Sequence, residues 1–323
     1  MTHPFESTAA LLSRMPAAKG SDIFMPARAS TLVYLIHGVT GTPAEMKYVG
    51  RRLWQQGFDV YLPSLPGHCS RFRDLLRSNE KTWLGHVETQ LAFARKYYDS
   101  VFAAGLSAGA LLALQASTRV PLEGVGVLSP TLFYDGWNVP RTQKLLDFGI
   151  HWLPSPLHYL FFHFDRFPYG IKNPALQGKL REAYNPFIRA RRFLQHSVGR
   201  FGRTPRSYSA AAVGYPLFFL KTLADLDRLY TTVKGNLDRV TAPTLIMQAR
   251  EDDFTSPKNA AFVYQQISSS DKRLVLLDDC YHVVTVDRQR DVVARELKDF
   301  IFSHLSGERD FTRSAFPFGR VVS

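Results

Sequence analysis

The chain has 323 residues, of which 45% are hydrophobic, and its 40 Lys and Arg against 28 Asp and Glu give a formal net charge of +12. This length allows a large buried core, and only two cysteines, Cys69 and Cys280, argue against a disulfide scaffold or a structural zinc site. Because no stretch approaches the roughly 20 apolar residues that span a bilayer and the amino terminus does not resemble a secretory signal, we expect a cytoplasmic protein.

Short apolar runs alternate with helical patterns along most of the chain. Strands are predicted at 31–37, 58–62, 101–104, 124–128, 244–248 and 273–277, and helices at 43–57, 80–98, 108–118 and 287–304. Strands that are apolar on both faces and alternate with helices are typical of a parallel sheet with helices on both sides. We therefore expect an α/β protein with a mostly parallel sheet.

The alternation stops between about residues 130 and 240. Residues 131–215 hold 12 Lys and Arg, 4 Asp and Glu and 17 of the 42 aromatic residues, so they carry +8 of the net charge. An insertion late in a parallel sheet favours a cap over the edge that binds ligands. We predict a core of residues 1–129 and 216–323 and a helical, aromatic and basic cap of residues 130–215.

Such a cap has several possible roles. Its basic and aromatic residues are compatible with an anionic membrane surface or an apolar substrate, or with a solvated basic face over an aromatic core. They form no recognisable nucleic-acid recognition module, so we expect no nucleic-acid partner.

A serine between two glycines, Gly105-Leu106-Ser107-Ala108-Gly109, lies where the strand 101–104 gives way to the helix 108–118. Ligands of open parallel sheets bind beyond the carboxyl ends of the strands. A serine on that turn exposes its hydroxyl, and the glycines avoid side-chain clashes. An ordinary helix N-cap would explain Ser107 but not both glycines. We interpret Ser107 as a nucleophile.

A serine hydroxyl needs a base, and the base needs an orienting acid. In sheets of this kind the chain order is serine, acid, histidine. Only His282 and His304 follow the strand 244–248, and His304 falls near the end of the last helix. His282 lies in a loop just after the strand 273–277, which is the position expected for the base.

The acid has several candidates. The loop after the strand 244–248 offers Glu251, Asp252 and Asp253, and Asp135 follows the strand 124–128. Asp253 is also placed to cap the helix that comes next. These residues alone favour no single carboxylate.

An oxyanion hole is predicted from His37-Gly38-Val39-Thr40-Gly41-Thr42, which follows the strand 31–37. Its glycines allow backbone N–H groups to face a small anion, and the N–H groups of Val39 and Ala108 are the natural pair. Loss of one such donor typically costs ~2.7–4 kcal/mol of transition-state stabilisation. We interpret His37 as a brace for this loop.

Five segments share a pattern with known proteins: LIHGVTGTPAEM (35–46), LPSLPGH (62–68), GLSAG (105–109), APTLIMQAREDDFTSP (242–257) and YHVVTVDRQRD (281–291). Together they resemble the α/β-hydrolase family, and specifically its bacterial carboxylesterase and monoacylglycerol lipase branch. The resemblance covers about 30–130 and 216–304. It implies the α/β-hydrolase fold with a helical cap insertion.

The resemblance also selects the acid. In that family a small residue and two variable ones precede the catalytic aspartate, and a proline follows five positions later. Here this pattern places the aspartate at Asp252, with Pro257 after it, and it likewise supports His282. In that family a second glycine often follows the sharp turn that carries the serine (the elbow), and here Ala110 stands in its place. The insert at about 130–215 does not align with the family, so the resemblance does not identify the substrate.

These observations predict a serine carboxylic ester hydrolase that needs no metal or organic cofactor and acts on an acyl ester of a small molecule or lipid. The same triad would serve a lysophospholipase, a thioesterase or an acyltransferase, because a fold does not fix the leaving group. An alternative from another functional class is that the chain is not an enzyme but binds lipid or a membrane surface through its basic cap.

Aromatic residues of the insert are candidate walls for an acyl chain: Phe133 and Trp137, and also Trp152, Phe161 and Phe162. Each of them is equally compatible with a role in holding the cap together. Cys69 and Cys280 lie in loops expected near the catalytic edge, and we interpret them as buried or incidental thiols.

Overall fold

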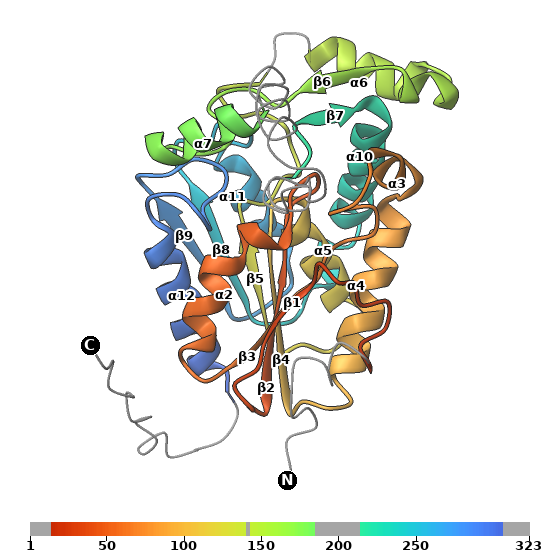
Figure 1. Ribbon diagram of the computed structural model, residues 1–323. Helices are drawn as coiled ribbons and strands as arrows, with labels where there is room; N and C mark the ends of the chain where they lie inside the picture. The colour runs from red at the N-terminus through yellow and green to blue at the C-terminus, as the bar shows by residue number, and fades with distance from the viewer. Residues whose placement is uncertain (1–13, 140–142, 185–213, 306–323) are drawn as a thin grey trace, which may run out of the picture.

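A seven-stranded sheet forms the centre of the computed structural model, which describes residues 14–139, 143–184 and 214–305 (Figure 1). In spatial order its strands are β1 (Ile23–Met25), β3 (Asp59–Leu62), β2 (Thr31–Ile36), β4 (Ser100–Leu106), β5 (Gly124–Leu128), β8 (Thr244–Ala249) and β9 (Lys272–Leu277). Every neighbouring pair is parallel except β1 with β3. The predicted mostly parallel sheet is confirmed, and β1 is a short edge strand that the pattern did not predict.

The strand β2 shows why the central strands are apolar throughout. All six of its residues are buried. Because successive side chains of a strand point to opposite faces, Leu32, Tyr34 and Ile36 join the core on one side of the sheet. Val33 and Leu35 join the core on the other side.

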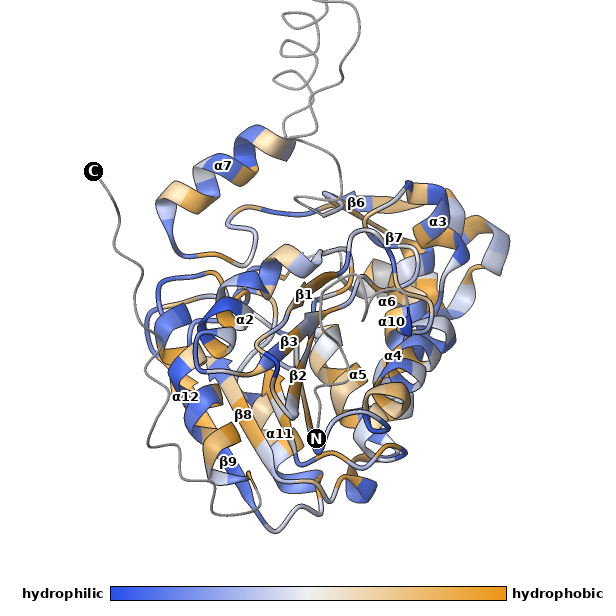
Figure 2. Ribbon diagram, turned by 60° about the horizontal axis from the view of Figure 1, so that its bottom comes forward, coloured by the Kyte–Doolittle hydropathy of each residue, from blue (hydrophilic) through white to orange (hydrophobic). Residues whose placement is uncertain are grey.

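Helices cover both faces of the sheet (Figure 1). One face packs against α2 (Lys47–Trp54) and α12 (Arg290–Ser303), and the other against α4 (Glu80–Ala94), α5 (Ala108–Ser117), α10 (Leu220–Lys234) and α11 (Lys258–Gln266). In Figure 2 the strands are mostly hydrophobic, whereas the helices alternate between hydrophobic and hydrophilic sides. The four predicted helices are confirmed, although the first is divided into a short 3-10 turn, η1 (Pro43–Glu45), and α2.

A second group of elements lies over the carboxyl ends of the strands, at the top of Figure 1. It comprises α6 (Gln143–Trp152), the 3-10 turn η2 (Ser155–Tyr159), β6 (Phe162–Phe164), α7 (Pro174–Tyr184) and β7 (Leu217–Phe219). The strand β6 pairs with β7 in an antiparallel ribbon. This ribbon joins the expected cap to residues just beyond its expected end at 215, and the division into core and cap stays a prediction.

Two short elements complete the described chain, α3 (Phe72–Arg77) beside α10 and η3 (Leu237–Arg239) beside α11. None of the helices in the described residues is both long enough and apolar enough to cross a membrane.

Candidate active site

A cavity of about 490 Å³ opens between the carboxyl ends of the strands and the elements above them. Its floor includes Val39, the adjacent residues Ser107 and Ala108, and His282, which come from three separate parts of the chain. Most of the remaining lining is apolar, and part of it comes from α6, α7, β7 and α10. These four groups predicted from the sequence therefore share one cavity.

Ser107 occupies a sharp turn between β4, which ends at Leu106, and α5, which begins at Ala108. Its backbone has φ 57° and ψ −119°. A non-glycine residue with positive φ is uncommon, and such strain gathers at functional sites. The Ser107 N–H donates to the Leu128 carbonyl oxygen at 2.8 Å, which holds the turn against β5. The strained corner points the serine hydroxyl into the cavity.

Both glycines of the elbow are required by close backbone contacts. A Cβ on Gly109 would lie 2.5 Å from the Ile36 carbonyl oxygen and 2.6 Å from that of His37. A Cβ on Gly105 would lie 2.1 Å from the Gly109 carbonyl oxygen. The start of α5 thus packs directly on the end of β2, and no larger residue fits at either position.

His282 and Asp252 form a hydrogen-bonded pair. The His282 Nδ1 atom lies 2.9 Å from Asp252 Oδ2 and 3.1 Å from Oδ1. The Asp252 carboxylate is buried, and it also accepts hydrogen bonds from the backbone N–H groups of Phe254 and Thr255 at 2.9 and 2.8 Å. Because a carboxylate accepts, Nδ1 carries the hydrogen and Nε2 is left as the proton acceptor.

The other candidate acids and the other late histidine have different partners. Asp253 accepts from the backbone N–H groups of Gly170 and His282 at 3.1 and 3.4 Å. Asp135 accepts from Ser256 and Asn259. Glu251 forms an ion pair with Lys172 at 2.7 Å, and His304 pairs with Asp271 at 2.8 Å. Among the described residues, Asp252 is the acid in contact with the His282 ring.

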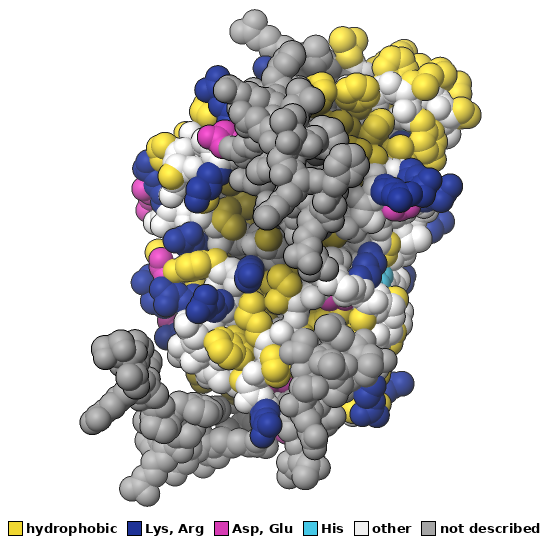
Figure 3. Space-filling view, viewed as in Figure 1, with side chains coloured by type: hydrophobic (Ala, Val, Ile, Leu, Met, Phe, Trp, Pro, Cys, Tyr) yellow, Lys and Arg dark blue, Asp and Glu magenta, His cyan; other side chains and the backbone are white. Residues whose placement is uncertain are grey.

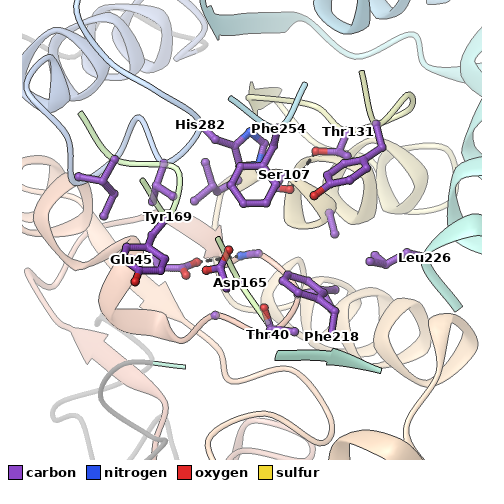
Figure 4. Close-up of a pocket in the computed structure, with 18 of the residues that line it drawn as sticks. Thr40, Glu45, Ser107, Thr131, Asp165, Tyr169, Phe218, Leu226, Phe254 and His282 are labelled. Carbon is purple, nitrogen blue, oxygen red and sulfur yellow. Dashed lines mark hydrogen bonds between the residues drawn. The ribbon is translucent and has the colours of Figure 1, made fainter. Parts of the chain in front are cut away.

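The Ser107 hydroxyl is hydrogen-bonded to Thr131, which the sequence analysis did not single out. The Ser107 Oγ and Thr131 Oγ1 atoms lie 2.9 Å apart. Figure 4 shows Ser107 between Thr131 and His282 in the cavity. Within the described part of the chain no hydrogen bond joins Ser107 to His282. Thr131 follows β5, and a polar residue just after a buried parallel strand was the signal that could have identified it.

Hydrogen bonds of two buried histidines hold the loop that follows β2 in place. The His37 ring accepts from the Leu65 N–H at 3.2 Å, and His68 accepts from the Thr40 N–H at 3.0 Å. Burial lowers the pKa of His37 to about 4, so this ring is neutral at pH 7. These contacts support the interpretation of His37 as a brace.

Two backbone N–H groups, those of Val39 and Ala108, have no acceptor among the described residues. The Ala108 N–H is the first of α5, and the first four N–H groups of a helix have no partner within it. The Val39 N–H follows the braced turn at Gly38. Both residues line the cavity next to Ser107.

Acidic groups surround the histidine. Burial raises the pKa of Glu45 and of Asp165 to about 7, and that of Asp253 to about 6. For His282, burial lowers the pKa, but the charge and hydrogen bond of Asp252, with the charges of Asp253 and Glu45, raise it above its usual 6.5 overall. Figure 4 shows Glu45 and Asp165 together at the side of the cavity opposite Thr131.

The apolar walls differ from those expected. Phe133 and Trp137 are not among the residues that line the cavity, and neither are Trp152, Phe161 and Phe162. Phe133 packs against Phe262, and Trp137 is 59% exposed and contacts Tyr281. The walls are instead formed by other apolar residues of the cap and α10: Tyr134, Ile150, Leu176, Leu180, Tyr184, Phe218, Leu223, Leu226 and Tyr230. Sequence reasoning missed these because the inner face of a cap depends on how its elements dock.

Both cysteines are free thiols, and neither lines the cavity. Cys280 is fully buried, and burial raises the pKa of its thiol well above the usual range. The Cys69 thiol is half-buried beside Ser64. These surroundings support their interpretation as buried or incidental thiols.

The chain is similar to known enzymes over most of its length. A family model described as serine aminopeptidase, S33, matches residues 27–289. A carboxylesterase from Bacillus subtilis is 25% identical over 83% of this chain and 91% of that protein. A thermostable monoacylglycerol lipase from Bacillus sp. is 26% identical over 90% of this chain and 97% of that protein.

A solved structure is similar as well. A soluble variant of monoglyceride lipase from Saccharomyces cerevisiae, in complex with a substrate analogue, superimposes with a TM-score of 0.67 at 15% identity. The match covers 88% of this chain and 91% of that chain. At this level of identity the likeness shows that the two chains share a fold.

Proposed function

We propose that this chain, which belongs to the Hydrolase_4 (serine aminopeptidase, S33) family and has the α/β-hydrolase fold, hydrolyses carboxylic esters through an acyl-enzyme on Ser107. The expected resemblance to bacterial carboxylesterases and monoacylglycerol lipases is confirmed. One observation carries the proposal. His282 is held by Asp252 at 2.9 Å and lines the same cavity as a serine on a strained turn.

In the first half of the reaction Ser107 attacks the ester carbonyl. The hydroxyl rotates from Thr131 toward His282, and the His282 Nε2 atom takes its proton while Oγ bonds to the carbonyl carbon. Asp252 holds the imidazole in the required tautomer and stabilises its charged form. The N–H groups of Val39 and Ala108 hold the oxyanion.

Collapse of this intermediate breaks the bond to the leaving alkoxide, which receives the proton from His282. The alcohol departs and the acyl group stays on Ser107. In the second half His282 takes a proton from water, and the resulting hydroxide attacks the acyl-enzyme carbonyl. The Ser107 oxygen leaves with that proton and the acyl group departs as the carboxylic acid, which returns the enzyme to its starting state.

The lining of the cavity supports an apolar acyl group in the substrate. Phe218, Leu226 and Tyr230 line it together with side chains from α6 and α7. Monoacylglycerols and other lipid esters have such a group, and the named relatives include a monoacylglycerol lipase. Lysophospholipids, thioesters and acyl transfer remain the alternatives that the same residues would serve.

The test compares the wild type with Ser107→Ala on p-nitrophenyl esters of short and long acyl chains. We expect a burst of p-nitrophenol from the wild type and none from the variant. A phosphonate ester should add its mass to the wild type alone, as measured on the intact protein. An unchanged melting temperature shows that the variant is folded. Equal bursts from both proteins, or no turnover of any ester by the wild type, would overturn the proposal.

A further inference from the structure

A group of exposed apolar side chains covers the outer surface of α6, β6 and the end of η2 between them. It consists of Leu145, Phe148, Trp152, Leu160, Phe162 and Phe164, each more than half exposed, with Trp152 at 75%. We name these six residues the cap patch. Figure 3 shows hydrophobic side chains gathered over this part of the molecule. Clustered exposure of this extent marks a surface that binds a partner, because water solvates large apolar patches poorly.

The elements that carry the cap patch also form the roof of the cavity. In β6, Phe162 and Phe164 face outward, whereas His163 between them lines the cavity and stacks on Phe218 of β7 at 5.2 Å. In α6, Phe148 and Trp152 are exposed, whereas Ile150 lines the cavity. A thin layer of protein therefore separates an apolar outer surface from an apolar cavity.

Positive charge borders the cap patch. Arg71, Arg73 and Arg77 are exposed on α3 and at its start, and Figure 3 shows Lys and Arg side chains there, directly beneath the hydrophobic group. Aromatic contacts connect the two surfaces, since Phe72 of α3 packs on Phe219 of β7, and Phe219 packs on Phe162. The arginines and the cap patch thus belong to one continuous face.

We propose that this face docks on an anionic lipid surface, with the cap patch inserted among the acyl chains and the three arginines against the headgroups. Trp, Phe and Leu beside cationic side chains are typical of proteins that lie in a membrane interface. Charge complementarity favours a bilayer, because anionic lipids attract each nearby arginine. The value of this docking for catalysis rests on the proposed ester hydrolase function, since it would place the roof of the cavity against the pool of lipid substrate. The docking itself does not depend on it.

The experiment measures sedimentation of the full-length protein with phosphatidylcholine vesicles that contain no or 30% phosphatidylglycerol (roughly the range in which surface charge attracts basic segments). All proteins carry Ser107→Ala, so hydrolysis cannot alter the vesicles and failure of the ester proposal leaves the result valid. We expect binding to the anionic vesicles that weakens at high salt. Phe148→Ser with Trp152→Ser should weaken it at least about tenfold, and Arg73→Gln with Arg77→Gln roughly thirtyfold.

Matched controls lie on other surfaces. Tyr264→Ser removes an exposed aromatic side chain on α11, and Arg295→Gln an exposed arginine on α12, and both should bind as the parent does. Absence of binding by the parent, or equal binding by patch and control variants, would overturn the proposal. So would a dimer in light scattering that becomes a monomer on Phe148→Ser with Trp152→Ser, because a second copy would then cover the face.

A second measurement joins docking to activity. With Ser107 intact, the cap-patch variants should hydrolyse a soluble short-chain ester as the wild type does, because neither Phe148 nor Trp152 lines the cavity. They should lose activity on a long-chain ester presented in anionic vesicles. Equal losses on both substrates would mean that the substitutions damage the site itself, and would count against the proposal.

Discussion

The Ser107 hydroxyl lies 2.9 Å from the Thr131 hydroxyl, on the opposite side from His282. Thr131 Oγ1 also lies 3.4 Å from the Ser129 carbonyl oxygen, to which it donates. Thr131 is therefore placed to accept the Ser107 hydrogen. The proposed reaction has to exchange this hydrogen bond for one to His282.

Replacement of Thr131 by Val removes that competing acceptor. A typical hydrogen bond contributes about 1 kcal/mol net, so kcat/KM for a soluble ester should stay level or rise by at most about fivefold. Thr131→Ser keeps the hydroxyl and should match the wild type. A tenfold or larger fall in Thr131→Val, with Thr131→Ser unaffected, would show instead that the hydroxyl stabilises the transition state.

Asp252→Asn should lower kcat by roughly 10⁴, the loss seen when an amide in place of the acid favours the wrong imidazole tautomer. Asp253→Asn is the matched control, because Asp253 is adjacent and buried but contacts backbone N–H groups rather than the ring. It should change kcat by less than about tenfold. Steady-state kinetics on one soluble ester measure kcat for both variants. Similar losses of kcat would show that Asp252 has no special role in orienting His282.

The pH dependence follows from the raised pKa of His282. The ring must be neutral to accept the Ser107 proton, and a raised pKa favours its charged form. The acid limb of kcat/KM, which reports the free enzyme, should therefore have its midpoint above 6.5. A midpoint below that value would contradict the electrostatic account.

Glu45→Gln tests the source of that shift. The charge of Glu45 is one of the influences that raise the pKa of His282, but Glu45 is itself partly protonated in this range because its pKa is about 7. Removal of its charge should therefore move the acid limb only slightly to lower pH. Glu251→Gln is the control, because Glu251 is exposed and paired with Lys172. It should leave the limb where it is in the wild type, and a shift common to both variants would refute a specific effect of Glu45.

Replacement of two helical glycines by alanine should change the free energy of unfolding in opposite directions. Gly109→Ala places a Cβ 2.5 Å from a backbone oxygen and should lower the free energy of unfolding by about 1–3 kcal/mol. Gly85→Ala lies on α4 with nothing within 4 Å of its Cβ and should raise that free energy by about 0.5–1 kcal/mol. Urea unfolding measures both. Equal stability of the two variants would show that the start of α5 can move away from β2.

The order of the six parallel strands and of the four expected helices, the serine elbow and the loop that carries the histidine were predictable from the sequence. Each depends on local chemistry: apolar runs form buried strands, glycines permit tight corners, and catalytic groups of parallel sheets follow strand ends. The family pattern selected Asp252, and its hydrogen bond to His282 agrees with that choice. These features can be predicted because each depends on residues that lie close together in the chain.

Only the tertiary structure decided which groups share the cavity. Thr131, Glu45 and Asp165 meet Ser107 and His282 there because separate elements dock around one space. The same docking turned Phe162 outward and Phe218 inward, although both are phenylalanines on short strands. A sequence specifies that such side chains are apolar, but the face of an isolated ribbon that becomes buried is set by what packs against it.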